Sequence, residues 1–280
     1  MCVPACHEQI VRAISRRSFL RNASVVAATG LVAGCASPTD RPAETESEGR
    51  TIRYSRVVDL THTLHEDFPT YFGARQLTIA NKFTAEKDGF NLNEWTINEH
   101  TGTHLDSPFH FNGENSADRI PIESLVGPLA VIDLRARAAE SADAQLTPDD
   151  IRAWESQHGP LPQGAIVALN SGWDARVMDS AGFRNADPAG TMHFPGFHVE
   201  VADFLLAERN VSGVIVDTLS LDYGMSPDFA FHFKWLTSNH WGIEGAANLS
   251  QLPASGATVV VGGPKIQGAT GGPSRVIAFA

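Results

Sequence analysis

The sequence predicts a single α/β domain built around a substantial mixed β-sheet. Short apolar runs of strand length outnumber segments with helical spacing, and the two kinds of segment are interspersed along the chain. No internal repeat is visible, and no linker divides residues 51–280. With 42% hydrophobic and 19% charged residues, the 280-residue chain has the balance of an ordinary globular protein.

Strands are predicted where short apolar or alternating runs are bounded by turn residues. In chain order they occupy residues 52–60, 77–83, 92–98, 129–134, 165–169, 211–216, 257–261 and 275–279.

Three helices are predicted between these strands. The first begins after Thr147 and runs to about residue 157, because Thr caps the start, Pro148 occupies the first turn and the two acids that follow complement the helix dipole. The second covers residues 199–208, where apolar residues recur on one face, and the third covers residues 229–238.

The N-terminal segment has the features of an export signal. Residues 15–21, Ser-Arg-Arg-Ser-Phe-Leu-Arg, resemble the twin-arginine export motif. The apolar run of residues 23–33 is too short to span a bilayer as a permanent helix, and it suits the hydrophobic region of a signal peptide. It leads into Leu-Val-Ala-Gly-Cys35, which resembles a bacterial lipobox. We therefore expect an extracytoplasmic, periplasmic protein with a lipid anchor at Cys35 as its membrane attachment.

These features predict three segments. Residues 1–35 form the twin-arginine signal peptide with its lipobox, and simple cleavage and release is the alternative to lipidation. Residues 36–50 are rich in Pro, Ser, Thr and Glu, which is typical of a flexible tether. Residues 51–280 form the folded domain. All three cysteines precede residue 36, so neither a disulfide nor a thiolate is available to that domain.

Net charge argues against one class of partner. The chain carries a formal charge of -11 and shows no basic stripe, whereas nucleic-acid binding requires clustered Lys and Arg. We therefore expect a small molecule as the partner and no nucleic acid.

Residues 100–111, His-Thr-Gly-Thr-His-Leu-Asp-Ser-Pro-Phe-His-Phe, contain the densest group of chemically active side chains. His100, His104 and Asp106 are imidazole and carboxylate ligands of the kind that Zn²⁺ or Mn²⁺ binds. The Thr-Gly-Thr between the first two favours an extended or irregular backbone, and Asp106 offers an oxygen that could bridge two ions. Because this segment directly follows the predicted strand 92–98, we expect a strand end to fix the first ligand.

His110 is the predicted proton-transfer residue. A divalent ion lowers the pKa of its water from about 16 to near 7, which provides a nucleophile for a carbonyl carbon. An imidazole with an ordinary pKa near 6.5 can take a proton from water and return it to the leaving nitrogen or oxygen. The segment therefore predicts a hydrolase that uses one or two Mn²⁺ or Zn²⁺ ions.

The same residues carry a family resemblance. Residues 100–111 match the His-x-Gly-Thr-His-x-Asp-x-Pro-x-His-Phe signature at every fixed position, and so the chain resembles the metal-dependent cyclase-like hydrolases, the family of bacterial kynurenine formamidase and isatin hydrolase. Further similarity over residues 52–280 lies in the stretches 59–62, 68–69, 171–173, 216–222 and 264–273. The resemblance implies the cyclase-like swivelling β/β/α fold, with a partly barrel-like sheet flanked by helices.

The resemblance also implies a second group of ligands, a His and a Glu twelve positions apart, and His232 and Glu244 have that spacing. It implies that His110 transfers protons and that the protein is a homo-oligomer, a dimer or a tetramer, with its sites near the interfaces. The implied activity is hydrolysis of an amide, a formamide, or a cyclic amide or ester of a small aromatic substrate.

Aromatic residues are the predicted substrate pocket, because a planar substrate packs well on such faces. The candidates are Phe72, Trp95, Trp173, Trp235 and His240. Ordinary core packing is the alternative for each of the four aromatic residues, and a position behind the ligands is the alternative for His240.

A function of another class also remains open, an exported lipoprotein that binds a metal or an aromatic ligand without converting it. The presence of His110 argues against it, because capture needs no proton-transfer group.

Overall fold

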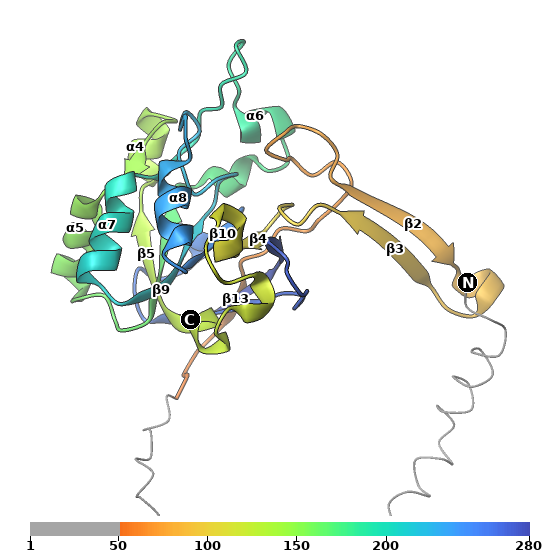
Figure 1. The fold of residues 1–280 in the computed structure, drawn as a ribbon, viewed down its shortest axis with the longest axis horizontal. Helices are drawn as coiled ribbons and strands as arrows, with labels where there is room; N and C mark the ends of the chain where they lie inside the picture. Colours follow the sequence, from red (N-terminus) through yellow and green to blue (C-terminus); the bar gives the residue numbers. More distant parts are fainter. Residues whose placement is uncertain (1–50) are drawn as a thin grey trace, which may run out of the picture. The chain divides into compact units, whose positions relative to one another are not determined.

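A curled, mixed sheet is the framework of the computed structural model, which describes residues 51–280 (Figure 1). The twin-arginine motif, the Cys35 lipobox and the tether of residues 36–50 lie outside the described residues. The strand order of the sheet is β1-β13-β11-β5-β7-β9-β10-β4-β12. Its strands are β1 (Val57–Asp59), β4 (His104–Asp106), β5 (Val126–Asp133), β7 (Ala165–Asn170), β9 (Val211–Val216), β10 (Trp241–Glu244), β11 (Ala257–Gly262), β12 (Gly271–Pro273) and β13 (Arg275–Phe279).

The central strands β5, β7, β9 and β10 pair in parallel, and the flanking strands pair antiparallel. Two smaller ribbons stand apart from this sheet, β2 (Leu77–Phe83) with β3 (Leu92–Ile97), and β6 (Gln145–Leu146) with β8 (Gly196–Phe197). The helices are α3 (Ala85–Asp88), α4 (Arg135–Glu140), α5 (Pro148–His158), α6 (Ser180–Arg184), α7 (Val199–Glu208) and α8 (Ala230–Thr237). Within residues 51–280, none of them combines the length and apolarity that crossing a membrane requires.

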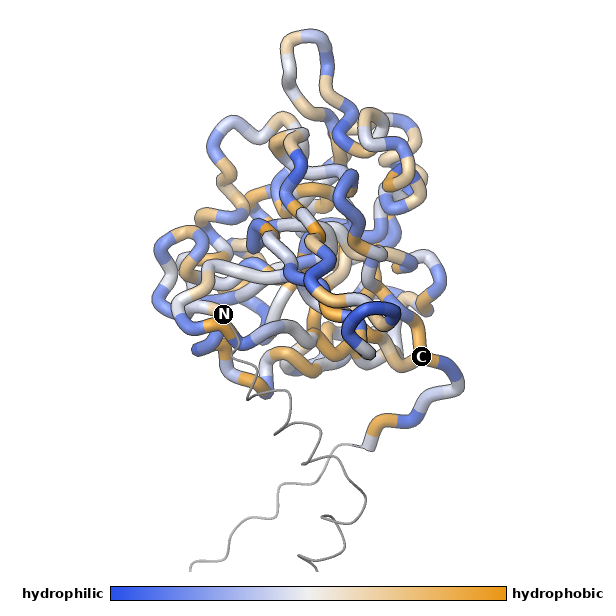
Figure 2. Tube along the Cα trace, turned by 90° about the vertical axis from the view of Figure 1, so that its right-hand side faces the viewer, coloured by the Kyte–Doolittle hydropathy of each residue, from blue (hydrophilic) through white to orange (hydrophobic). Residues whose placement is uncertain are grey.

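The sheet has an apolar cluster on each face because successive side chains of a strand point to opposite faces. In β7, Val167 and Leu169 pack with α5, α7 and α8, which cover one face. Ile166 and Ala168 belong to the second cluster, which draws on strands from β1 to β13 and on no α-helix. The sheet therefore curls so that its second face packs largely against itself, and Figure 2 shows orange and blue residues alternating along much of the trace.

The structure confirms the predicted α/β class and the mixed, partly barrel-like sheet. The predicted strands 77–83, 211–216 and 275–279 and the helix 199–208 have their observed bounds. The first predicted strand is much shorter than expected, because only Val57–Asp59 pairs with β13 and the residues before it are exposed. Strands β4, β10 and β12 were not predicted as strands, since each is only three or four residues long.

Asp217 connects the loop that follows β9 to the loop that follows β7. Its fully buried carboxylate accepts hydrogen bonds from the Ser171 backbone N (3.0 Å), the Ser171 hydroxyl (2.6 Å) and the Trp173 backbone N (3.1 Å). The Trp173 indole in turn donates to the Phe183 carbonyl at 2.8 Å. The turn after β7 is thereby fixed against the end of β9, where residues 218–220 line the cavity described below.

Replacement of Asp217 tests this contact through its pH dependence. Burial raises the pKa of Asp217 to about 7, which outweighs the hydrogen bonds from Ser171. In the unfolded chain the carboxyl titrates near 4, so between pH 4 and 7 the native state holds a proton that the unfolded state has lost. The contribution of Asp217 to the free energy of unfolding therefore decreases as the pH rises from 4 to 7. Asp217→Asn mimics the protonated acid. We expect the difference in free energy of unfolding, Asp217→Asn minus wild type, to increase from pH 4 to pH 7, as measured by urea denaturation.

Asp217→Ala is the comparison. It leaves three buried donors without an acceptor, and we expect a loss of about 1–3 kcal/mol for each donor that finds no water. Parallel stability curves for wild type and Asp217→Asn across pH 4–7 would contradict the raised pKa.

Candidate metal centre

Strand β4 places two predicted ligands on one face of the sheet. His104 and Asp106 are the first and last residues of this strand, and Leu105 between them points into the apolar cluster behind the sheet. Strand β10 pairs with β4 antiparallel so that Glu244 lies directly opposite His104. The cross-strand pair thus brings Glu244 beside two ligands that are about 140 residues earlier in the sequence.

His100 comes from the loop between β3 and β4. Its Nδ1 lies 2.7 Å from Asp106 Oδ1, and its Nε2 lies 2.9 Å from the Thr270 hydroxyl. The loop can make this approach because Gly102 has a φ of +72°, and a Cβ there would lie 2.0 Å from a Leu64 methyl group. Gly271 has a similar role on the other side, since a Cβ at that position would lie 2.8 Å from the His100 ring.

Helix α8 supplies His232. Its Nε2 is 2.8 Å from Glu244 Oε1 and 3.4 Å from Asp106 Oδ2, and its Nδ1 is 2.6 Å from Asp222 Oδ2. Asp222 also accepts the backbone N–H groups of Phe231 and His232 at the start of this helix, where a negative charge is favoured. One carboxylate therefore fixes both the helix start and the orientation of the imidazole.

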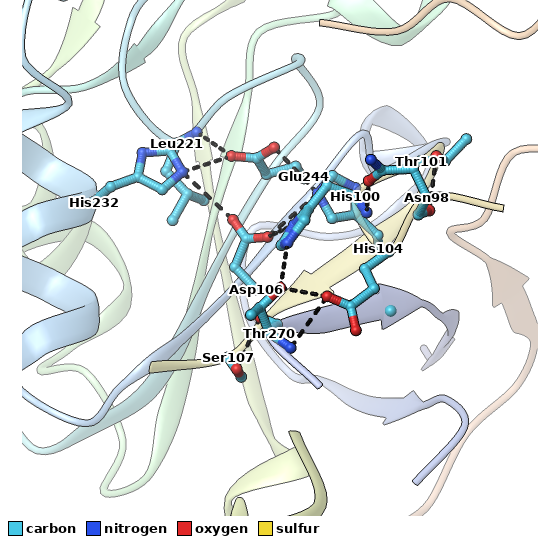
Figure 3. A network of polar contacts seen from close by, with 12 residues as sticks. Asn98, His100, Thr101, His104, Asp106, Ser107, Leu221, His232, Glu244 and Thr270 are labelled. Carbon is cyan, nitrogen blue, oxygen red and sulfur yellow. Dashed lines mark hydrogen bonds and ion pairs between the residues drawn. The ribbon is translucent and has the colours of Figure 1, made fainter. Parts of the chain in front are cut away.

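The five predicted ligands form one polar network, with Asp106 at its centre (Figure 3). Two overlapping groups have ligand atoms within 4.8 Å of one another: His104 with Asp106 and Glu244, and His100 with Asp106 and His110. Both groups share Asp106, and His232 contacts both carboxylates. The arrangement could hold one or two cations.

The donor set fits a divalent cation. His104 Nδ1 donates to the Gly102 carbonyl at 2.8 Å, so the ring, once it loses its second proton, would present the lone pair of Nε2 to an ion held by the carboxylates. That nitrogen is buried without a hydrogen-bond partner, and the nearest oxygens, of Asp106 and Glu244, are 3.3 and 3.4 Å away. Asp106 Oδ2 is buried and unpartnered as well. Unsatisfied buried acceptors that converge in this way are what an ion would satisfy.

The charges at this site are strongly coupled. Burial would lower the pKa of His104, but pairing with Asp106 and Glu244 raises it to about 10. Burial would raise the pKa of Asp106, but the bonds from His100 and His104 hold it well below its usual range. Pairing with Asp106, Asp222 and Glu244 likewise raises the pKa of His232. Without a cation the carboxylates therefore retain protons on His104 and His232, and a divalent ion would have to displace those protons in order to bind.

His110 lies beside the ligands on a short 3₁₀ helix, Pro108–Phe111. Its ring stacks on that of His100 with centroids 3.9 Å apart. Burial lowers the pKa of His110, and the charges of His100 and His232 lower it further against the opposing effect of Asp106. His110 is therefore neutral near pH 7 and able to accept a proton.

A cavity of about 360 Å³ opens onto these groups. Its inner end is formed by His100, His104, His110, His232 and Glu244. Its walls are mainly aromatic and apolar: Phe68, Pro69, Tyr71, Phe72, Phe111, Phe183, Leu219 and Phe229. Gln76, Asn98 and Ser220 add polar groups, and no Lys or Arg lies in the lining. The Ser220 hydroxyl is buried without a partner, which leaves it free to bind a ligand atom.

Only one of the predicted pocket residues, Phe72, lines this cavity. Trp95 is 69% exposed on β3, and Trp173 is buried with Arg176 over its ring. Trp235 is fully buried on α8, and its indole donates to the Trp241 carbonyl. His240 packs on Trp235 with ring centroids 4.6 Å apart and does not line the cavity. These four residues therefore lie outside the lining of this cavity, and core packing, the alternative for the aromatic residues, describes Trp173 and Trp235.

Sequence reasoning also missed residues that the structure places at the site. Tyr71, Phe111 and Phe229 line the cavity, and the Phe111 ring stacks on His232 at 5.0 Å. The sequence pattern includes Asp222 in the stretch 216–222 but does not single it out as a site residue. A carboxylate ten residues before a predicted His ligand was the available signal, but spacing alone does not reveal an orienting hydrogen bond.

Comparison with known proteins gives consistent results. The sequence profile of the family named Cyclase matches residues 58–223, which include the whole segment 100–111. Isatin hydrolase of Roseibium aggregatum is 35% identical over 204 residues, 69% of this chain and 77% of that protein. A kynurenine formamidase of Bacillus thuringiensis subsp. konkukian is 34% identical over 86 residues, 30% of this chain and 41% of that protein.

A solved structure shows the same fold. Isatin hydrolase A from Ralstonia solanacearum aligns with a TM-score of 0.75 and 38% sequence identity, over 80% of this chain and 92% of that one. The sequence and structure comparisons confirm the predicted family resemblance.

Asp222→Asn tests the role of the carboxylate that orients His232. An amide cannot hold the imidazole N–H as strongly, and loss of such an orienting group typically costs about 10–100-fold in metal affinity. We expect a decrease of that size for Mn²⁺ or Zn²⁺, measured by competition with a chromophoric chelator. Asp203→Asn is the matched control, because Asp203 also pairs with a residue of α8, Lys234, but on the exposed side. Equal affinities of wild type and Asp222→Asn would contradict the assignment.

Proposed function

The chain belongs to the cyclase family, and on this premise we propose that it is a metal-dependent hydrolase that opens the amide bond of a small, uncharged aromatic substrate. The observation that carries the proposal is the buried group of His104, Asp106 and Glu244, with its unpartnered nitrogen and oxygen, at the inner end of an aromatic cavity. The relatives are named isatin hydrolase and kynurenine formamidase, which supports hydrolysis of a cyclic amide or a formamide.

His100, His104, Asp106, His232 and Glu244 are the residues that would hold Mn²⁺ or Zn²⁺. When bound there, the ion supplies an acidified water and polarises a carbonyl oxygen. The chain itself fixes the ligands: the Gly102 carbonyl sets the tautomer of His104, Thr270 holds Nε2 of His100, and Asp222 holds Nδ1 of His232. Preorganised ligands of this kind do not have to reorient during the reaction.

His110 is the residue that moves the proton. It lies at the cavity next to the ligands, and its lowered pKa keeps the imidazole neutral near pH 7. Its ring first accepts a proton as water attacks the carbonyl carbon, and then donates that proton to the nitrogen that leaves as the amide bond breaks. The stacking on His100, with ring centroids 3.9 Å apart, holds the His110 ring beside the ligands.

The cavity wall favours an uncharged substrate. A volume of about 360 Å³ suits a ligand of one or two rings, and six aromatic side chains provide the faces on which a planar molecule packs. N-formylkynurenine carries a carboxylate and an ammonium group, and burial of a carboxylate without a cation is costly. Because no Lys or Arg lines the cavity, we propose that a fused cyclic amide is the better substrate.

A substrate panel tests the activity and its selectivity. We expect chelator-treated protein to be inactive, and Mn²⁺ or Zn²⁺ to restore hydrolysis of isatin. With the restored enzyme, kcat/KM for isatin should exceed that for N-formylkynurenine by on the order of 100-fold, because the charged substrate is bound without a counter-ion. The measurement is the absorbance change on ring opening or deformylation.

Three other results would each revise the proposal. Activity that survives complete removal of the metal would contradict metal dependence. Preference for N-formylkynurenine would contradict the substrate class. An aromatic ligand that binds tightly and is recovered unchanged would favour a binding protein.

His110→Gln tests proton transfer separately from metal binding. We expect kcat to fall by about 10²–10⁴-fold while metal content stays at the wild-type level. Because its pKa is lowered, wild-type His110 becomes protonated only below pH 6.5, so the wild-type rate should fall as pH decreases through that range. The variant should lack this decrease at saturating metal. His158→Gln, on the surface of α5, is the control, and an unchanged kcat in His110→Gln would contradict the role.

A further inference from the structure

Glu99, the residue before the candidate ligand His100, is joined to the metal centre through Thr270. Its Oε2 atom accepts hydrogen bonds from both the backbone N–H (3.2 Å) and the hydroxyl group of Thr270. The oxygen of the same hydroxyl group lies 2.9 Å from Nε2 of His100. A continuous chain of contacts therefore runs from a half-buried carboxylate, through one hydroxyl group, to an imidazole of the candidate site.

The segment before β12 holds Thr270 in position. Its backbone carbonyl accepts hydrogen bonds from the backbone N (2.9 Å) and the hydroxyl group (2.8 Å) of Ser107, a fully buried residue directly after β4 (Figure 3). The next residue, Gly271, pairs with Asp106 in the sheet. Thr270 is thereby fixed to the strand that carries two of the ligands, with its side chain between Glu99 and His100.

The number of available protons sets the direction of each hydrogen bond in this chain of contacts. A hydroxyl group has one proton to donate. The Glu99 oxygen is an acceptor, because the backbone N–H of Thr270 can only donate and it points at that oxygen. The hydroxyl proton of Thr270 is directed at the same oxygen, so the hydroxyl oxygen is left to accept from His100. Nε2 of His100 is therefore a nitrogen that carries a proton.

His100 differs in this respect from two other candidate ligands. Nδ1 of His104 is held by a backbone carbonyl and Nδ1 of His232 by a carboxylate, so both rings turn Nε2 toward Asp106 and Glu244. In His100 the atom held from outside is Nε2, and Nδ1 is the atom that lies 2.7 Å from Asp106 Oδ1. In a neutral ring with its proton on Nε2, the lone pair is on Nδ1 and points at the central carboxylate.

Stacking on His110 does not by itself decide the orientation of the His100 ring. The two rings lie 3.9 Å apart at an interplanar angle of 25°. A half-turn of His100 about its Cβ–Cγ bond would keep this plane but exchange each nitrogen for a carbon atom. Only the polar contacts with Asp106 and Thr270 distinguish the two orientations.

We infer that Glu99 is a positioning residue for the metal centre: through the Thr270 hydroxyl group it holds a proton of His100 on Nε2 and leaves Nδ1 for a cation. Carboxylates that orient a metal-binding imidazole commonly accept its N–H group directly. Here a hydroxyl group stands between the carboxylate and the ring. The inference rests on the proposed metal-dependent function, but it does not depend on the identity of the substrate.

Zinc affinity, measured by competition with a chromophoric chelator, tests this contact without any substrate. Thr270→Val removes the hydroxyl group at nearly constant volume, and we expect the affinity for Zn²⁺ to fall by about 10–100-fold. Thr270→Ser keeps the hydroxyl group and should bind Zn²⁺ as tightly as wild type. Circular dichroism should match wild type in both variants.

Replacement of Glu99 tests the other end of the contact. In Glu99→Leu the Thr270 hydroxyl group is free to donate to Nε2 of His100, which would move the ring proton to Nδ1, so we expect a loss of zinc affinity in the same range. Glu99→Gln retains an acceptor oxygen and should keep more of the affinity than Glu99→Leu. Glu94→Leu is the matched control, because Glu94 pairs with Lys82 on the exposed ribbon of β2 and β3.

The position of the ring proton is a readout that a merely structural role would not change. In zinc-loaded wild-type protein labelled with ¹⁵N-histidine, nuclear magnetic resonance should show the proton of His100 on Nε2. For His104 and His232 the proton should be on Nδ1. In zinc-loaded Thr270→Val, the Nε2–H signal of His100 should exchange faster with water, because its acceptor has been removed.

Wild-type zinc affinity in Thr270→Val and Glu99→Leu would overturn the inference, as would a proton of His100 on Nδ1 in the zinc-loaded wild type. Equal losses in Thr270→Ser and Thr270→Val would also overturn it, because packing rather than the hydroxyl group would then be responsible. If the variants lose zinc affinity as expected but the zinc-loaded wild type hydrolyses no substrate, the proposed hydrolase function fails and the role of Glu99 stands.

Discussion

The antiparallel pairing of β4 with β10 places Glu244 opposite His104 and next to Asp106, and the surrounding contacts follow from the need to stabilise that buried charge. Two carboxylates so close to each other in an apolar interior would be strongly destabilising without compensation. Three imidazoles provide it, through contacts of 2.7 to 3.4 Å. A cation that replaced the protons on His104 and His232 would bind among groups that are already in place.

Support for this pair comes from distant parts of the chain. Thr270 reaches His100 from the segment before β12, and Asp222 reaches His232 from the loop after β9. The turn at Gly102 provides the carbonyl that orients His104, and it is possible only because that position has no side chain. Each contact fixes a ring whose orientation decides whether its lone pair points at the carboxylates.

The cavity has a polar inner end and an aromatic wall. Its inner end carries imidazole and carboxylate groups, and its wall is aromatic without Lys or Arg. The wall thus offers apolar faces to a ligand and no counter-ion to a charged group.

The sequence by itself determined the α/β class, the positions of the longer strands and helices and the family. These follow from local rules, because a strand such as 211–216 or a helix such as 199–208 carries its periodicity in its own residues. The sequence also named the residues that converge in the candidate site, since a twelve-residue signature keeps His100, His104, Asp106 and His110 within one short segment.

Only the tertiary structure decided the rest. Short strands such as β10 have no periodic signal, so their pairing depends on the neighbours that the curled sheet provides. The pocket wall could not be predicted for the same reason: Trp173 and Trp235 are as aromatic as Phe111 and Tyr71, and only the packing of their elements sets which rings face the cavity. Local chemistry selects the residues that can react, whereas long-range packing decides which of them meet.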